Sequence, residues 1–156
     1  MICYSRTTSD NKDFQKLVEA LDAELRIIDG EDHLFYAQLN KTDGIRHVIV
    51  AYEDSTAVGC GAIREYGEEI MEVKRMYVQT AHRGKGVAFG VLSELEKWAA
   101  ELKYKKCILE TGDKQIAAIN LYQKSGYNRM ENFGKYQGIG NSVCFEKYIV
   151  QMNIGF

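Results

Sequence analysis

One stretch decides the fold of this chain: Glu72-Val-Lys-Arg-Met-Tyr-Val-Gln-Thr-Ala-His-Arg-Gly-Lys-Gly-Val-Ala88. Its first part predicts a β-strand, and its last part predicts a glycine-rich turn that opens an amphipathic helix. The helix is indicated because apolar residues recur with the helical period after the turn, at Val91, Leu92, Leu95, Trp98, Ala99 and Leu102. We therefore expect the strand to lead into the helix through backbone that carries few side chains.

A turn of this kind leaves several N–H groups unpaired at a helix N-terminus, where the helix dipole also favours negative charge. It could hold a phosphate or pyrophosphate group, although glycine is equally common in such turns for steric reasons alone. Two familiar nucleotide motifs are excluded. The turn contains no Gly-x-Gly-x-x-Gly, and its Gly-Lys is not followed by Ser or Thr as a P-loop requires.

Composition indicates a single globular domain. With 156 residues, of which 46% are hydrophobic and 27% charged, the chain is long enough for one proper core. We expect one domain over residues 1–150 and a C-terminal tail over residues 151–156. The formal net charge of −2 argues against a general nucleic-acid binder, and no apolar run approaches the ~20 residues of a membrane span.

The cysteines and the N-terminus indicate the compartment. The four cysteines are far apart and form no Cys-x-x-Cys, so neither a zinc site nor a disulfide framework is predicted. The first residues lack the basic patch and apolar run of a signal peptide. We therefore expect a reduced, cytoplasmic protein with no metal, no nucleic-acid partner and no membrane partner.

The remaining segments show either the apolar spacing of a helix or the apolar-rich runs of a strand. A strand at 2–7 precedes a helix at 11–28, for which Ser9 or Asp10 is the expected N-cap. Gly126 is the expected C-cap of a later helix. The order β, α, α, β, β, β, α, β, α, β, β predicts a mixed α/β domain. Further elements are expected as a short helix after residue 29, a hairpin at 47–52 and 57–64, strands at 70–78, 106–111, 127–133 and 142–150, and helices from 88 and at 115–125.

Two motifs carry a resemblance to a known family. Arg83-x-x-Gly86-x-Ala88, between a strand and a helix, resembles the acyl-CoA signature of the GNAT superfamily of N-acetyltransferases. The segment Ala118-Ile-Asn-Leu-Tyr-Gln-Lys-Ser-Gly-Tyr127 is similar to the family's second familiar motif and follows at about the expected distance. Together with the element order, the similarity covers residues 2–150, and the chain is identified as a member of this superfamily.

The resemblance implies a fold and an activity. The fold is a central, mostly antiparallel mixed sheet, in which a parallel central strand pair is splayed around the cofactor and about four helices flank the sheet. The activity is transfer of the acetyl group of acetyl-CoA to a primary amine, by direct attack in a ternary complex. The acceptor would be a small-molecule or peptide amine. The alternative is a non-catalytic acyl-CoA-binding sensor or scaffold.

The resemblance also implies which residues bind acetyl-CoA. The turn would donate N–H groups to the pyrophosphate, and the end of the preceding strand would pair with the pantetheine amides. The charged side chains of the turn are equally well explained as solvated surface cations. Family members often carry proline where this chain has Thr80 and asparagine where it has Gln115. The replacement at Gln115 affects one side-chain contact to the cofactor. The implied cofactor residues are Met76, Tyr77, Val78, Arg83, Gly84, Lys85, Gly86, Val87, Ala88 and Gln115.

Glu72 is the candidate general base, by its match to the catalytic glutamate of the histone-acetylating branch. An amine with a pKa near ~10.4 is almost entirely protonated at pH 7, so a local base accelerates its attack. In a regular strand, Glu72 would share one face with Lys74 and Met76, and a bulge within this stretch would change that. The alternative is a glutamate at the edge of the sheet, paired with Lys74 or Arg75.

Tyr122 is the candidate general acid, because the family commonly places a tyrosine at this motif position. A phenol with a pKa near ~10 is protonated at pH 7 and can donate to the departing CoA thiolate. The alternative is a tyrosine that only packs the helix against the core.

The acceptor and the assembly are less constrained. In the family the first two helices help to wall the acceptor cleft, and here they are rich in acids, which suggests a cationic acceptor; a solvated helix face is the alternative. The apolar tail could form a homodimer contact, or it could pack within its own domain. The acids are Glu19, Asp22, Glu24, Asp29, Glu31 and Asp32.

Overall fold

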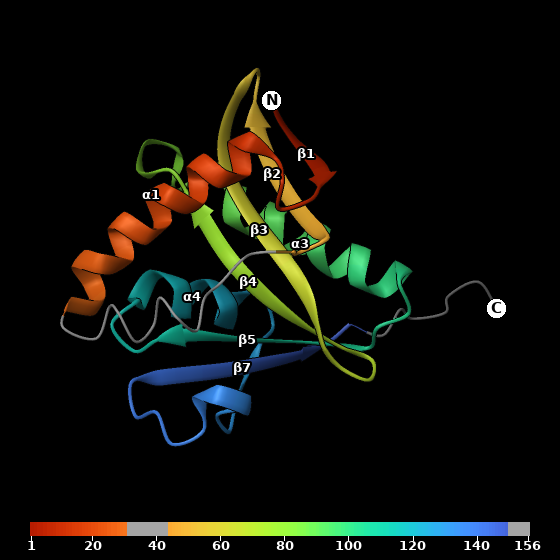
Figure 1. Cartoon of the computed structure of the whole chain (residues 1–156), viewed down its shortest axis with the longest axis vertical. Coiled ribbons are helices and arrows are strands. Elements are labelled where there is room, and N and C mark those ends of the chain that lie inside the picture. The colour runs from red at the N-terminus through yellow and green to blue at the C-terminus, as the bar shows by residue number, and fades with distance from the viewer. Residues whose placement is uncertain (31–43, 150–156) are drawn as a thin grey trace.

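The computed structural model describes residues 1–30 and 44–149, and its core is one seven-stranded sheet (Figure 1). The strand order is β1-β2-β3-β4-β5-β7-β6, and every neighbouring pair is antiparallel except β4 and β5. The strands are β1 (Ile2–Thr7), β2 (His47–Glu53), β3 (Thr56–Gly67), β4 (Ile70–Val78), β5 (Lys106–Gly112), β6 (Asn128–Met130) and β7 (Ser142–Tyr148).

Helices cover both faces of this sheet. The helices within the described ranges are α1 (Lys12–Asp29), α3 (Val87–Glu101) and α4 (Ile116–Lys124), with 3-10 turns η2 (Thr80–His82) and η3 (Gly134–Tyr136). Phe14 and Leu17 of α1 pack on one face, against a cluster that includes Val48. Val91 and Leu95 of α3 pack on the other face. None of the helices within residues 1–30 and 44–149 combines the length and apolar character of a membrane-spanning segment.

The predicted mixed α/β fold is confirmed, with corrections at the ends of elements. Helix α1 is capped by Asn11 and not by Ser9 or Asp10, because the Asn11 side chain accepts a hydrogen bond from the Phe14 N–H at 2.9 Å. Strand β6 is shorter than the predicted 127–133. Gly126 follows α4 at a φ of +92°, as expected of a glycine there. The predicted second helix and the tail at 151–156 lie outside the described residues.

The parallel pair β4 and β5 stays together only briefly. Its register runs from Ile70 opposite Lys106 to Glu72 opposite Ile108, which is three residue pairs. Beyond this point the two strands diverge like the sides of a V (Figure 1). The predicted splayed central pair is therefore present, and the second half of β4 has no strand neighbour on its β5 side within the described part of the chain.

A β-bulge interrupts β4 where the strands part. Cys60 lies opposite Tyr77 and Ala62 lies opposite Lys74, so Gly61 faces two residues of β4 instead of one. The extra residue is Arg75, which has a φ of +58°. A bulge of this kind reverses which side chains point to which face of the sheet.

Strand β4 is therefore not regular, and the shared face that a regular strand would give to Glu72, Lys74 and Met76 is not present. Glu72 and Lys74 share one face, and Arg75 also lies on that face, where it pairs with Asp22 of α1. Met76 instead lies on the α3 face, because a Cβ added at Gly61 would come within 2.6 Å of the Met76 Sδ and 2.8 Å of Val91. The bulge thus separates Met76 from the charged residues that precede it.

The bulge leaves no room for a side chain at Gly61. In a Gly61→Ala variant the new methyl group would crowd Met76, Val91 and Leu95 at 2.6–2.9 Å. We expect the free energy of unfolding to fall by about 1–3 kcal/mol, as measured by urea denaturation. Gly67→Ala is the matched control, since a Cβ at Gly67 meets nothing within 4 Å. Equal denaturation midpoints for the two variants would contradict this packing.

Candidate active site

A large groove lies where β4 and β5 diverge. Its volume is about 650 Å³. The end of β4, the glycine turn and the start of α3 form one side, and α4 and the second half of α1 form the other. A groove of this size accommodates an extended ligand and not merely a small ion.

The glycine turn lines the groove with backbone that carries no side chain at Gly84 or Gly86. Gly84 and Gly86 both have a φ of +81°, and a Cβ at either position would meet nothing within 4 Å. Glycine is therefore required here by the left-handed backbone and not by crowding. The first helical hydrogen bond of α3 is donated by the Gly90 N–H to the Gly86 carbonyl at 3.0 Å. The N–H groups at 87–89 precede it and remain available to an anion.

Arg83 holds the turn against its surroundings. Its Nε donates to the Val78 carbonyl at 2.8 Å, which ties the turn to the end of β4. Its guanidinium also pairs with the Glu24 carboxylate at 2.8 Å and lies over the Tyr77 ring. The side chain lines the groove, so it both positions the turn and adds positive charge beside it.

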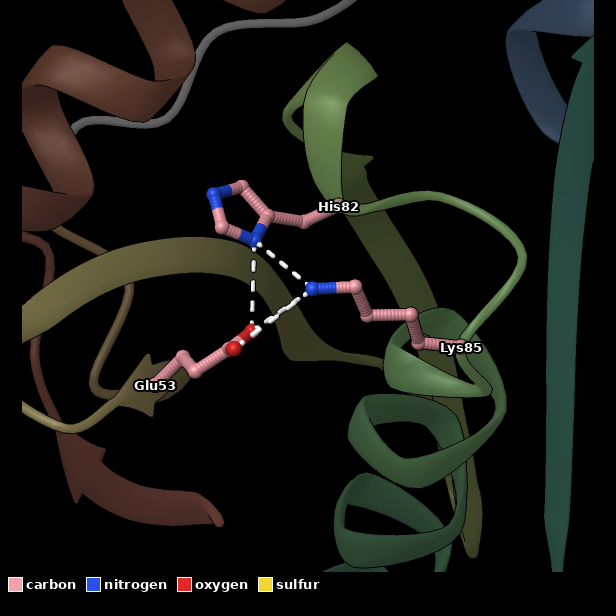
Figure 2. A network of polar contacts seen from close by, with 3 residues as sticks. All are labelled: Glu53, His82 and Lys85. Atoms are coloured by element: carbon pink, nitrogen blue, oxygen red, sulfur yellow. Dashed lines mark hydrogen bonds and ion pairs between the residues drawn. The ribbon is translucent and has the colours of Figure 1, made fainter.

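Lys85 is engaged outside the groove. Figure 2 shows its ammonium group pointing to the Glu53 carboxylate, with His82 completing a three-residue network. The Lys85 Nζ lies 3.1 Å from a Glu53 oxygen, and the His82 Nδ1 lies 3.2 Å from the same oxygen. Opposite charges beside the Glu53 carboxyl lower its pKa, with Lys85 as the largest cause. Lys85 does not contact the groove in this arrangement.

The structure brings the other implied cofactor residues together. Nine of the ten line the groove, from Met76 on β4 to Gln115 before α4. The residues that we did not single out come mainly from one face of α1 and one face of α4. The helical spacing of these residues is visible in the sequence, but the same spacing is typical of a helix face that packs against a core. These residues are Leu21, Leu25, Ile28, Ala117, Asn120, Leu121 and Lys124, together with His82 and Phe89 from the region of the glycine turn.

A second, smaller cavity adjoins the groove. Its volume is about 90 Å³, and its wall includes Glu72, Lys74 and Arg75 of β4, together with Tyr136. Six residues line both spaces, so the two are adjacent. These are Leu21, Leu25, Met76, Gln115, Ala118 and Tyr122. Tyr122 therefore lies at the boundary between the groove and the small cavity.

The Tyr122 phenol is buried at this boundary. Its ring packs against Tyr127 and Phe145, with ring centroids 5.9 Å and 6.1 Å away. Burial raises the pKa of Tyr122 well above its ordinary value, and the nearby Glu110 carboxylate raises it further. The phenol therefore keeps its proton at neutral pH, as a proton donor must.

Glu72 lies in the interior of the sheet and not at its edge. It sits between β3 and β5, with only 7% of the residue exposed, and its carboxylate lies 3.5 Å from the Lys74 ammonium group. The pairing with Lys74 that we gave as an alternative is thus present. Burial lowers the pKa of Lys74, and the Glu72 charge partly offsets this effect.

Glu110 is a functional candidate that sequence reasoning missed. It lies on β5 and lines the small cavity with Glu72, and the Ser142 hydroxyl donates to its carboxylate at 2.7 Å. Its charge contributes to the raised pKa values of both Tyr122 and Tyr136. The sequence gives no signal for Glu110, because the apolar and polar residues of β5 do not alternate clearly along the strand. Within the described ranges, no group of three or more His, Cys, Asp or Glu side chains could hold a metal ion.

Comparisons with known proteins agree with this geometry. Residues 13–127 match the model of the acetyltransferase (GNAT) family. An IAA acetyltransferase from Azospirillum brasilense is 35% identical over 85% of this chain and 88% of that protein. A solved structure assigned as an acyl-CoA N-acyltransferase from Klebsiella pneumoniae has a TM-score of 0.81 at 31% identity, over 96% of this chain and 98% of that chain. A PaiA N-acetyltransferase from Thermoplasma acidophilum, solved with coenzyme A, shares the fold at a TM-score of 0.68 and 16% identity, over 95% and 99% of the two chains.

The buried phenol predicts a specific titration behaviour. Because burial disfavours the phenolate, Tyr122 should ionise only well above the ordinary pKa of ~10. We expect the phenolate absorbance of the wild type and of Tyr122→Phe to remain equal up to pH 10, with folding monitored by circular dichroism. N-acetyl-tyrosinamide is the reference. A difference of one phenolate between the proteins below pH 10 would contradict the burial of this group.

Proposed function

The chain belongs to the GNAT acetyltransferase family, and from this premise we propose that it transfers the acetyl group of acetyl-CoA to a primary amine by direct attack in a ternary complex. Acetyl-CoA is the co-substrate of this fold. The observation that carries the proposal is the early divergence of β4 and β5, beside which lies a groove lined by both the glycine turn and Tyr122.

The groove matches the parts of acetyl-CoA. The N–H groups at 87–89 and the Arg83 charge suit the pyrophosphate. The second half of β4 offers backbone groups that lack a β5 partner, and the amides of the pantetheine arm can pair with them as a strand would. The thioester would then reach the region of Met76 and Tyr122, next to the small cavity. Gln115 lines both spaces and can offer its amide to the arm.

The small cavity is the place for the acceptor amine. Its two carboxylates, Glu72 and Glu110, attract a protonated amine and can remove its proton. We assign the base to Glu72, with Glu110 as the second carboxylate of the same cavity. The neutral amine then attacks the thioester carbonyl. As the carbon–sulfur bond breaks, Tyr122 gives its proton to the departing sulfur, and the second proton lost by the attacking nitrogen returns to the Tyr122 oxygen, so that the amide and free CoA thiol are released. Positioning of the two reactants supplies most of the acceleration, since effective molarities can reach ~10⁵ M or more.

The charge around the cavity refines the idea of a cationic acceptor. Asp22 and Glu24 of α1 are ion-paired with Arg75 and Arg83, so they do not form a uniformly negative wall. The attraction for a protonated amine is instead assigned to Glu72 and Glu110, which lie inside the cavity. The cytoplasmic location and the homodimer remain predictions.

Acetyl-CoA binding is tested by adding a negative charge to the turn. In Gly86→Glu, the carboxylate would stand where the pyrophosphate approaches, so we expect calorimetric titration to show at least a hundredfold loss of affinity. Gly86→Ala strains the same left-handed backbone without adding charge and should lose much less. Gly67→Glu, in open space away from the groove, is the charge control. Unchanged affinity in Gly86→Glu would refute the role of the turn.

The acid role of Tyr122 is tested by removing its hydroxyl group. Tyr122→Phe should lower kcat by about 10²–10⁴-fold, with the affinity for acetyl-CoA nearly constant, because the proton for the departing sulfur is lost. Tyr127→Phe is the matched control, since this neighbouring buried tyrosine donates instead to Glu96 on α3. The readout is free CoA thiol. Equal kcat values for wild type and Tyr122→Phe across the pH range would remove Tyr122 as the acid.

A further inference from the structure

We propose that the acceptor is a small amino carboxylate, whose ammonium group faces Glu72 and Glu110 and whose carboxylate faces Lys74 and Arg75. This inference rests on the proposed function and names the substrate class of the same site. It is carried by the size of the small cavity, by the two signs of charge in its wall, and by a buried donor of Arg75 that lacks a partner.

The size of the cavity favours a compact acceptor head. About 90 Å³ corresponds to roughly six to nine water molecules, since each needs about 10–15 Å³ of such volume. A carboxylate and an ammonium group separated by one carbon fit within this space. A long polyamine would have to leave most of its charges outside it.

The wall of the cavity carries both signs of charge, and they are buried. The side chains of Lys74 and Arg75 are each 3% exposed, and that of Glu72 is 9% exposed. Burying charges is costly unless each one is compensated. A ligand with one positive and one negative group adds no net charge to this wall, whereas a diamine would place a second cation close to Lys74 and Arg75.

Arg75 contributes an unpaired hydrogen-bond donor, which favours an anionic group in the ligand. One end of its guanidinium pairs with Asp22, but its Nε is buried and has no hydrogen-bond partner among the described residues. A buried unsatisfied donor costs about 1–3 kcal/mol, and more when it is charged. A ligand carboxylate that enters beside Arg75 would supply the missing acceptor, in a charge-assisted hydrogen bond.

The positive charges around Lys74 also favour the binding of a ligand carboxylate. Burial is the main cause that lowers the pKa of Lys74; the Glu72 charge opposes it, and the charges of Lys135 and Arg64 lower the pKa further. The cavity therefore has a positive side at Lys74 and Arg75, where a carboxylate is stabilised. It has a negative side at Glu72 and Glu110, where the reacting ammonium group can lose its proton.

The inference is tested with matched acceptors. Acetyl transfer is measured as free CoA thiol for each standard amino acid, for its carboxamide, and for the amine that lacks the carboxyl group, with putrescine as a diamine. At least one amino acid should exceed its carboxamide by tenfold or more in kcat/KM, because only the amino acid offers an anion to Arg75 and Lys74. The amine of a carboxamide has a lower pKa than that of the amino acid, so more of it is neutral at pH 7. Amine reactivity alone would therefore give the carboxamide the higher kcat/KM.

Variants then assign this preference to the cavity. Lys74→Met should lower kcat/KM for the amino acid at least tenfold while changing that of the carboxamide much less, so the preference shrinks. Lys97→Met, at an exposed position on α3, should keep the wild-type preference. If Lys74→Met fails to fold, Lys74→Gln replaces it, and the affinity for acetyl-CoA verifies that the fold is intact.

The outcomes separate this inference from the proposed function. If carboxamides, plain amines or putrescine are acetylated as well as every amino acid or better, the acceptor class is wrong but the transferase proposal stands. If acetyl-CoA binds and nothing on the panel is acetylated, the acceptor class is also wrong. If acetyl-CoA does not bind at all, the proposed function itself fails.

Discussion

The site depends on one constraint, which is that β4 and β5 stay paired for only three residue pairs. A parallel pair that continued would saturate the backbone of both strands and close the sheet. Because the strands part after Glu72, the second half of β4 keeps free hydrogen-bonding groups, and α4 and the glycine turn line the resulting opening. The same divergence places Tyr122 between the groove and the small cavity, where two substrates can meet.

The bulge at Arg75 divides β4 into two functional parts. Before the bulge, Glu72 and Lys74 face the small cavity. After it, Met76 faces α3, and the strand continues along the groove. The extra residue also frees the Arg75 carbonyl from regular pairing, and the Cys60 thiol donates to this carbonyl at 3.4 Å. Burial raises the pKa of Cys60 to about 12, so the thiol keeps the proton that this contact needs.

Much of the fold was predictable, because its signals are local in the sequence. The helical period after Ala88, the left-handed glycines of the turn and the position of Tyr122 all follow from spacing or from the motif resemblance. The bulge was not predictable, because its left-handed residue is an arginine and not a glycine. Glu110 was also missed. It is a candidate because it lies close to Tyr122, and only the tertiary structure brings these two residues to the same cavity. Pairing between distant charges, such as Asp22 with Arg75, is a tertiary property that spacing does not reveal.

We propose that the open half of β4 and the glycine turn hold acetyl-CoA through their backbone N–H groups. Hydrogen exchange, measured by mass spectrometry with and without saturating acetyl-CoA, tests this directly. We expect slower exchange at residues 76–78 and 83–89, and little change in the edge strands β1 and β6. Unchanged exchange in both segments, in a sample shown to contain bound acetyl-CoA, would contradict it.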